Sequence, residues 1–387
     1  MISCLLSTIF KLLWLVRNFT GVPLTVQLSP KVFIIDFFSM EQSTWFGIPE
    51  FDLLARNITI PGLSPKDPDV HCTKDGAICQ VLTSEGEINA ATAITALIFS
   101  SAFDLRNTYF LLAGIAGINP HLGTLGSVAF SRYAVQATLQ YEIDAREKPS
   151  QFPGGYFPQG TSGPDMYPLV IYGTEVFELN DALRQRAIAF ARTAVLNDTA
   201  DAQAYRAKYA AEPAFAAAVA APSVIACDSA TADTFWTGSL LATDVERTVK
   251  LLTNDSGTYC TAQQEDNAAL AALLRGALAG RVDFGRIVEM RTGSNFDRPP
   301  PGMSALDGLL FGMTVGPGFQ VSLENIYLAG VKVVQGIIAN WGKTFAAGVP
   351  AQNYVGDILG SLGGAPDFGI QNQTSPPRKA KKPPPDL

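Results

Sequence analysis

The stretch that most constrains the fold is an apolar run at residues 109–113, Tyr-Phe-Leu-Leu-Ala, which leads directly into Gly114 and Gly117. A continuous apolar run that ends in glycine is typical of a strand buried on both faces of a sheet covered by helices. Glycine has no Cβ, so it lets the backbone approach another group closely. We therefore predict a central strand that ends in a turn at Gly114, Ile115 and Gly117, and we expect this turn to line a pocket for a small molecule.

The order of the other expected elements predicts an α/β fold. A strand, a helix and a second strand in succession are typical of sheets whose faces are covered by helices. Short β-branched and aromatic runs predict strands at residues 31–35, 77–82, 223–227, 258–262 and 286–291, and helical spacing predicts helices at 91–99, within 179–220, and at 244–252, 268–278 and 323–341. The sequence thus predicts one domain at residues 30–366, with a central mixed β-sheet flanked by helices.

The two ends of the chain differ from this domain. Residues 1–29 contain a short apolar run that Lys11 interrupts, so they are interpreted as a leader or an N-terminal extension, with an amphipathic helix or a misassigned start as alternatives. Residues 367–387 are rich in proline and lysine and predict a disordered tail. No other stretch reaches the roughly 18 consecutive apolar residues of a spanning helix, so no transmembrane bundle is predicted.

Composition excludes some classes of ligand. Apolar residues make up 47% of the chain, which is enough for a large core. The 28 lysines and arginines against 35 acidic residues give a net charge of −7, so the chain has no basic field for nucleic acid. With two histidines and no Cys-x-x-Cys pair, no zinc site is predicted. Small neutral ligands fit this composition better.

Cysteines and glycosylation tripeptides favour an oxidising compartment. Cys72 and Cys79 flank a short turn and can form one disulfide, and Cys227 with Cys260 can form a second. Asn-x-Ser/Thr tripeptides begin at Asn18, Asn57, Asn197, Asn254 and Asn372. We therefore expect a secreted or cell-surface glycoprotein, with a cytoplasmic location as the alternative.

Several expected strands end in polar or glycine-rich segments. Because the carboxyl ends of parallel strands share one sheet edge, these ends are predicted to gather the following residues: Glu41, Gly114, Gly117, Phe235, Glu265, Asn295 and Asp297. Each has a purely structural alternative, since Glu41 and Glu265 can cap helices, Asn295 can hold a turn and Phe235 can belong to the core. The irregular stretch at 149–168 is either a functional loop or an ordered surface excursion.

The order of five segments resembles the purine nucleoside permease family of fungi and bacteria. These segments are residues 86–90, 113–120, 127–130, 258–266 and 291–299, and the resemblance covers about residues 30–366. The family in turn resembles the nucleoside phosphorylase superfamily, whose members are α/β enzymes that cleave N-glycosidic bonds. The resemblance therefore implies a nucleoside-phosphorylase-like domain that needs no cofactor and no metal, and it implies a homo-oligomer.

Matching segments imply roles for particular residues. Glu41 resembles a catalytic glutamate, and Gln264 with Glu265 resembles the pair that binds the ribose hydroxyls. Asn295 resembles the residue that handles the purine N7, and Asp297 is a second candidate for proton donation. Aromatic side chains expected to stack on the base are Phe235, Trp236 and Tyr156.

Phosphate binding is where the chain departs from the phosphorylases. Ile115 stands where the turn of those enzymes has a serine, and the cations left to substitute are Arg132, Arg291 and Arg298. If these do not bind phosphate, Glu41 can activate water instead. The predicted function is purine nucleoside binding with N-glycosidic cleavage by phosphate or water. A nucleoside uptake component without its own pore and a structural protein on an inactive scaffold are the alternatives.

Overall fold

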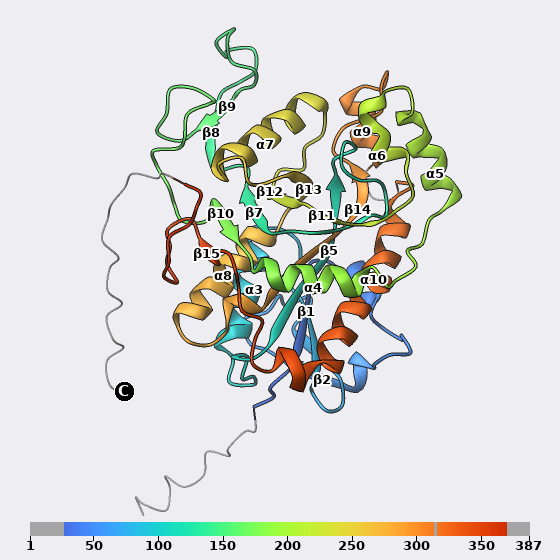
Figure 1. The fold of residues 1–387 in the computed structure, drawn as a ribbon, viewed down its shortest axis with the longest axis vertical. Helices are drawn as coiled ribbons and strands as arrows, with labels where there is room; N and C mark the ends of the chain where they lie inside the picture. Colours follow the sequence, from blue (N-terminus) through green and yellow to red (C-terminus); the bar gives the residue numbers. More distant parts are fainter. Residues whose placement is uncertain (1–26, 313–315, 370–387) are drawn as a thin grey trace, which may run out of the picture.

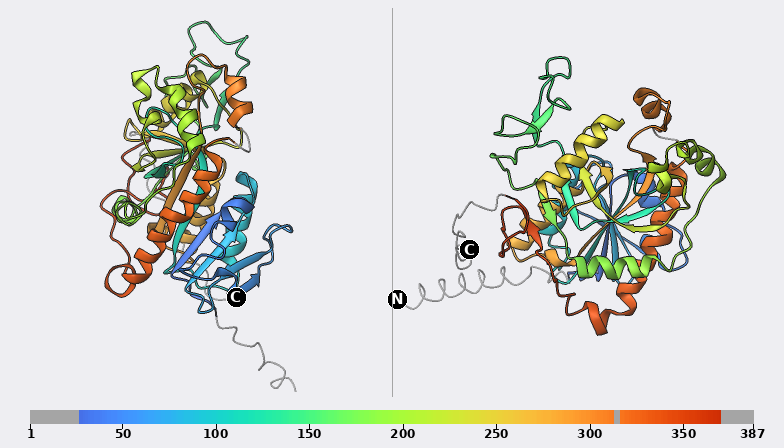
Figure 2. Two further views of the ribbon diagram at one scale, coloured as in Figure 1. Left: turned by 90° about the vertical axis from the view of Figure 1, so that its right-hand side faces the viewer. Right: turned by 45° about the horizontal axis from the view of Figure 1, so that its top comes forward.

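The computed structural model describes residues 27–312 and 316–369 (Figure 1). Most of the predicted N-terminal extension, the Asn18 and Asn372 tripeptides and nearly all of the predicted tail lie outside the described residues. The described chain is an α/β fold with a thirteen-stranded mixed sheet and helices on its faces, as the sequence predicted. A separate two-stranded hairpin projects from the body of the molecule (Figure 2).

The strands of the structure have the following bounds: β1 Val32–Asp36, β2 Arg56–Thr59, β3 Asp69–Cys72, β4 Ile78–Leu82, β5 Tyr109–Ile118, β6 Val128–Phe130, β7 Tyr133–Gln136, β8 Gln140–Glu142, β9 Tyr156–Pro158, β10 Val176–Glu178, β11 Val224–Ala226, β12 Asp228–Thr231, β13 Tyr259–Gln263, β14 Ile287–Phe296 and β15 Gly356–Asp357. Its α-helices are α2 Ser39–Ser43, α3 Glu87–Phe99, α4 Asp181–Ala191, α5 Ala200–Arg206, α6 Ala216–Val219, α7 Ser239–Leu252, α8 Asp266–Leu278, α9 Ala305–Gly312 and α10 Phe319–Ala339. Short 3₁₀ turns lie at Leu53–Ala55, Ala207–Tyr209, Pro213–Phe215 and Phe284–Arg286, and a π-helical turn at Trp341–Phe345.

The main path of the sheet runs in the order β15-β10-β7-β12-β13-β5-β1-β4-β3-β2, and β14, β6 and β11 branch from it in that order, beginning at β5. Strand β5 pairs in parallel with β1 and with β14, whereas it pairs antiparallel with β13. Every residue of β1 is buried, and its side chains divide between two cores. Phe33 and Ile35 pack with α3 and α8, while Val32 and Ile34 pack with α4 and α10. The alternation of a strand thus places a helical layer on each face.

Two strands are longer than the sequence predicted. The expected turn at Gly114 and Gly117 is wrong, because β5 continues to Ile118, and β14 continues through the expected polar exit to Phe296. Glycine usually weakens a strand interior, and that rule produced both errors. Here the glycines make room for neighbours: a Cβ on Gly293 would lie 2.9 Å from the Ile118 side chain and 3.0 Å from the Thr124 carbonyl oxygen.

Both predicted disulfides are present. Cys72 on β3 is bonded to Cys79 on β4, and Cys227 before β12 is bonded to Cys260 on β13. Among the described residues, α10 is the one helix long and apolar enough to cross a membrane, and most of its apolar window is buried inside the fold.

Candidate functional site

The candidate site begins at a gap in the pairing of β5. Strand β1 pairs with β5 as far as Ile35 and Leu112, and β13 pairs with the same strand from Ala262 and Gly117 onward. Strand β1 runs parallel to β5 and β13 runs antiparallel to it, and the two strands separate at this point. Neither of them pairs with residues 113–116. We call residues 113–116 the β5 notch. Buried backbone groups need hydrogen-bond partners, so side chains must supply them in the notch.

Glu41 and Arg291 supply those partners at Ile115. The Ile115 N–H donates to Glu41 Oε1 at 2.6 Å, and Arg291 Nη1 donates to the Ile115 carbonyl oxygen at 3.0 Å. Glu41 Oε2 accepts from the N–H groups of Phe37 and Phe38 at the start of α2. The helix-capping alternative for Glu41 is therefore correct, and the same carboxylate also binds the notch. Burial raises the pKa of Glu41 well above its usual range, although Arg291 opposes this.

Arg291 lies at the centre of the site and is 1% exposed. Its guanidinium donates to both carboxylate oxygens of Asp266, at 2.5 and 3.1 Å, and to Glu265 Oε2 at 3.1 Å. It also lies over the Phe37 ring, 4.2 Å from the ring centroid. Burial alone would lower the pKa of Arg291, but the Asp266 and Glu265 carboxylates outweigh it and raise the pKa overall. Arg291 therefore stays charged, as buried ion pairs with good hydrogen bonds allow.

Gly114 makes this arrangement possible. A Cβ at Gly114 would collide with Arg291 Nη1 and would lie 2.8 Å from Glu41 Oε1. A Cβ at Gly117 would instead meet Asn295 Nδ2 at 3.4 Å, which is an ordinary van der Waals contact. The predicted need for glycine is therefore steric at Gly114, where side chains rather than a bound ligand occupy the space.

The first turn of α3 binds side chains that follow β12 and β13. The Gly86 N–H donates to Glu265 Oε1 at 3.2 Å, and the Glu87 N–H donates to Asp233 Oδ1 at 2.8 Å. Gln264 Nε2 donates to the Asp233 carbonyl oxygen at 2.7 Å. Carboxylates are favoured at helix N-termini, where N–H groups lack partners within the helix. Glu265 is the N-cap residue of α8, but its side chain makes no capping bond to α8 and instead binds the start of α3, so the capping alternative holds for α3 rather than for α8.

Asn295 and Asp297 lie farther along β14. Asn295 pairs with Gly117 after a bulge in the β14 ladder, and its Oδ1 accepts from Ser294 Oγ at 2.9 Å. It is part of a strand, so the turn alternative for Asn295 is wrong. Asp297 is buried, and its oxygens accept from Arg298 at 2.7 and 3.0 Å and from the Tyr259 hydroxyl at 3.0 Å. The Asp297 carboxylate is therefore already committed to an ion pair.

The predicted base-stacking aromatics line a cavity of about 430 Å³. Phe235 and Trp236 come from the segment between β12 and α7, and Tyr156 comes from β9 in the long irregular stretch. Leu306 and Leu309 of α9 line the same cavity. Phe235 is 53% exposed, so the core alternative for it is wrong. We call Arg291 and the carboxylates of Glu41, Glu265 and Asp266 around it the Arg291 cluster. Asp233 lies two residues before Phe235, and its side chain bonds to the first turn of α3, which also binds Glu265. This short segment connects the cavity to the Arg291 cluster.

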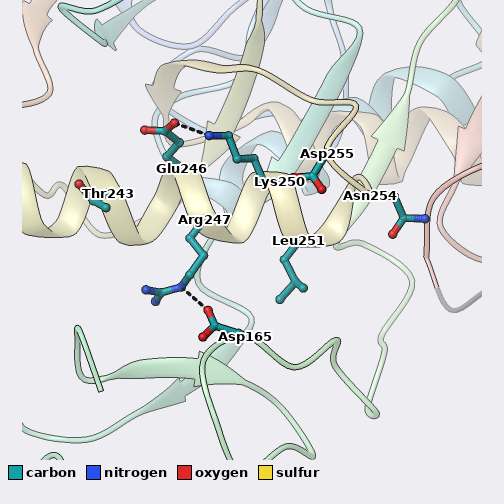
Figure 3. A pocket seen from close by; sticks show the side chains of 8 residues that line it. All are labelled: Asp165, Thr243, Glu246, Arg247, Lys250, Leu251, Asn254 and Asp255. Atoms are coloured by element: carbon teal, nitrogen blue, oxygen red, sulfur yellow. Dashed lines mark hydrogen bonds and ion pairs between the residues drawn. The ribbon is translucent and has the colours of Figure 1, made fainter. Parts of the chain in front are cut away.

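A second hollow, of about 510 Å³, lies on the outer face of α7 (Figure 3). Its lining is charged, and its cations already have partners: Lys250 pairs with Glu246 at 2.7 Å and Arg247 with Asp165 at 3.8 Å. None of the site residues predicted from the sequence lines it. The charged hollow on α7 is therefore not the site assembled at the notch.

The three arginines considered for phosphate are all paired with carboxylates. Arg132 directly precedes β7 and bonds to Glu178. The other end of β7 is the one near the site, because Gln136 there bonds to Glu87 in the first turn of α3. Arg291 bonds to Asp266 and Glu265, and Arg298 bonds to Asp297. The structure does not bring Arg132 to the cluster.

Sequence reasoning missed several residues of the cluster. Asp266, Asp233 and Glu87 were not among the candidates, and Arg291 was considered only for phosphate. The available signal was position, because Asp266 directly follows Glu265 at the carboxyl end of β13. The pairing of Arg291 with Asp266 joins residues 25 positions apart on different elements, which no local pattern reports.

Comparison with known proteins identifies the family. A family model described as purine nucleoside permease matches residues 29–350. The chain belongs to the purine nucleoside permease family. A purine nucleoside permease from Candida albicans is 45% identical over 357 residues, covering 91% of this chain and 86% of the relative. A probable purine nucleoside permease from Schizosaccharomyces pombe is 41% identical over 320 residues, covering 81% and 90% of the two chains. The family predicted from sequence segments is confirmed.

Solved structures outside the purine nucleoside permease family are similar at low sequence identity. A 5′-methylthioadenosine/S-adenosylhomocysteine nucleosidase from Neisseria meningitidis has a TM-score of 0.46 and 14% identity, covering 80% of this chain and 98% of its own. A futalosine hydrolase from Helicobacter pylori has a TM-score of 0.45 and 13% identity, with the same coverage.

The Gly114→Ala variant of this permease family member is expected to lose about 1–3 kcal/mol of unfolding free energy. The new methyl group must displace Arg291 or Glu41, which are both buried and both bonded to the Ile115 backbone. Urea denaturation measures the loss, and Gly117→Ala is the matched control because its methyl group fits. Equal losses in the two variants would show that the steric argument is incorrect.

Proposed function

We propose that this protein binds a purine nucleoside and cleaves its N-glycosidic bond with water. Membership of the purine nucleoside permease family supports the ligand class. The choice of water rests on one observation, which is that each arginine considered for phosphate is already neutralised by a carboxylate. A phosphate ion approaching Arg291 would also meet Glu41, Glu265 and Asp266. Such a site repels a dianion and accepts a neutral molecule.

Breaking the bond from C1′ to the purine leaves an oxocarbenium-like sugar and an electron-rich base. Glu265 is the group proposed to accept hydrogen bonds from the ribose hydroxyls and to favour positive charge on the sugar. Burial raises the pKa of Glu265, whereas Arg291 acts in the opposite direction and favours the ionised form. Arg291 and the first turn of α3 fix the position of this carboxylate.

Glu41 is the proposed general base. Its Oε1 lies at the β5 notch, and the nearby guanidinium of Arg291 lowers the pKa of Glu41 against the effect of burial, which favours the ionised form that can take a proton from water. Backbone N–H groups of Phe37, Phe38 and Ile115 hold it in place, so the base is positioned before the ligand arrives. Because the carboxylate is already held in place, positioning it costs no further entropy when the proton is transferred.

The purine is proposed to lie toward the cavity lined by Phe235 and Trp236, where it can stack on an aromatic ring. The amide of Asn295 can donate to the purine N7 or O6 but cannot deliver a proton. Asp297, the other candidate donor, is bonded to Arg298 and Tyr259. We therefore propose that hydrogen bonding from Asn295, rather than proton transfer from Asp297, stabilises the leaving base.

A second function uses the same site without cleavage. The named relatives are permeases, so a nucleoside-binding component of an uptake system fits the family. In that case the Arg291 cluster would bind the nucleoside through its ribose, and the protein would release the nucleoside unchanged.

Purified protein incubated with inosine, adenosine or guanosine is expected to release free base at the same rate with and without phosphate. Chromatography of the products measures this directly. Release that requires phosphate would select phosphorolysis instead of hydrolysis. No release in either condition, together with nucleoside binding in a calorimeter, would overturn cleavage and favour the uptake function.

Glu265→Gln is expected to lower turnover by about 100-fold or more, because a neutral amide cannot favour a positively charged sugar. The fold should remain intact, as circular dichroism would show. Glu246→Gln on the outer face of α7 is the matched control, since it makes the same substitution at a partly exposed ion pair whose cation is Lys250 rather than Arg291. Wild-type turnover in Glu265→Gln would remove Glu265 from the site.

We also propose that the protein passes through the secretory pathway. Two disulfides support an oxidising compartment, and Asn57 on β2 and Asn254 after α7 are exposed, so their tripeptides are accessible. Protein from its native host is expected to carry sugar on Asn57 and to lose mass on treatment with a glycosidase. Free thiols at Cys72 and Cys79 in that material would contradict the proposal.

A further inference from the structure

Glu289 is a buried carboxyl group that the proposed mechanism does not use. It lies on β14 two residues before Arg291, so the two side chains share the face of the sheet that packs against α8. The residue is 1% exposed. In the described part of the chain, neither of its oxygens accepts a hydrogen bond from any N–H or O–H group.

The neighbours of Glu289 make an ionised carboxylate unfavourable. The groups against it are Asp266 from α8, Ser131 after β6 and Arg291 on its own strand. Arg291 is the one cation among them, and it is already bonded to both oxygens of Asp266. A second carboxylate beside Asp266 would be a buried charge without a partner, which is strongly unfavourable.

A proton on Glu289 removes this conflict. Burial, and then the negative charge of Asp266, raise the pKa of Glu289 well above its usual range. A protonated carboxyl group has an O–H that can donate to Asp266 and a carbonyl oxygen that can accept from Ser131. Ser131 Oγ is also buried without a partner, so one proton satisfies the orphan atoms of two residues.

We propose that Glu289 is a neutral carboxylic acid that donates a hydrogen bond to Asp266 and thereby positions Arg291 and Glu265. The catalytic part of this inference rests on the proposed function. The resulting chain of hydrogen bonds runs from Ser131 through Glu289 to Asp266, where it meets the guanidinium of Arg291. Arg291 then donates to Glu265 Oε2 and to the Ile115 carbonyl oxygen, so Glu289 acts on the ribose site without touching the ligand.

Two substitutions of similar size separate positioning from simple packing. Glu289→Gln keeps a neutral donor and an acceptor in the same place, whereas Glu289→Met fills the volume without either. Both variants are expected to fold, because replacing a buried polar group by an apolar one of similar shape is often neutral for stability. Thermal unfolding would verify this.

Glu289→Gln is expected to retain wild-type turnover of the nucleoside, and Glu289→Met is expected to lower kcat by about tenfold, the effect of one lost hydrogen bond. Wild-type turnover in both variants would mean that Glu289 only fills space. A loss in Glu289→Gln as large as that in Glu289→Met would mean that its negative charge is required. Either result would overturn the proposal.

Infrared spectroscopy tests the protonation state independently of activity. At neutral pH the wild-type protein is expected to show a carbonyl band from a protonated carboxylic acid that is missing from the Glu289→Gln spectrum. If no such band disappears, Glu289 is ionised and the proposal fails. If wild type releases no base but the band is lost, the proposed function fails while the neutral acid at Glu289 stands.

Discussion

Burying the guanidinium of Arg291 requires compensating negative charge, and most of the candidate site follows from meeting that requirement. Asp266 and Glu265 arrive from the end of β13, and Glu41 arrives from the end of β1. Each carboxylate is held by backbone N–H groups or by Arg291 itself, so none can move without leaving another group unpaired. The side chains of the cluster therefore hold one another in place through these hydrogen bonds.

The β5 notch explains why this cluster lies where it does. A strand paired along its whole length on both edges has no backbone groups to offer to side chains. Here β1 and β13 divide one edge of β5 between them and separate before they meet. The free N–H and C=O of Ile115 are the result, and Glu41 and Arg291 bind them. The change of strand direction along this edge of β5 therefore leaves the unpaired backbone groups at which the candidate site is assembled.

The sequence predicted the fold class, both disulfides and most of the strands, because these depend on apolar alternation and on short-range patterns. It misjudged the ends of β5 and β14, since Gly114, Gly117 and Gly293 look like strand breakers in isolation. The roles of Gly114 and Gly293 depend on Arg291, Ile118 and Thr124, which approach from other segments, whereas Gly117 has room for a methyl group. For the site, the sequence identified Glu41 and Glu265 but not the reason they lie together. That reason is Arg291, which bonds to Glu265 and to Ile115, the residue that Glu41 also binds, and only the folded chain brings these groups into contact.

The disulfide between Cys227 and Cys260 has a consequence beyond stability. Cys227 directly precedes β12 and Cys260 lies near the start of β13, whereas Asp233 and Glu265 follow the opposite ends of these two strands. The covalent bond thus fixes the spacing of the strand pair at one end, and at the other end the first turn of α3 binds both carboxylates. The spacing of Asp233 and Glu265 in the candidate site therefore depends in part on a covalent bond, and such bonds persist in oxidising compartments.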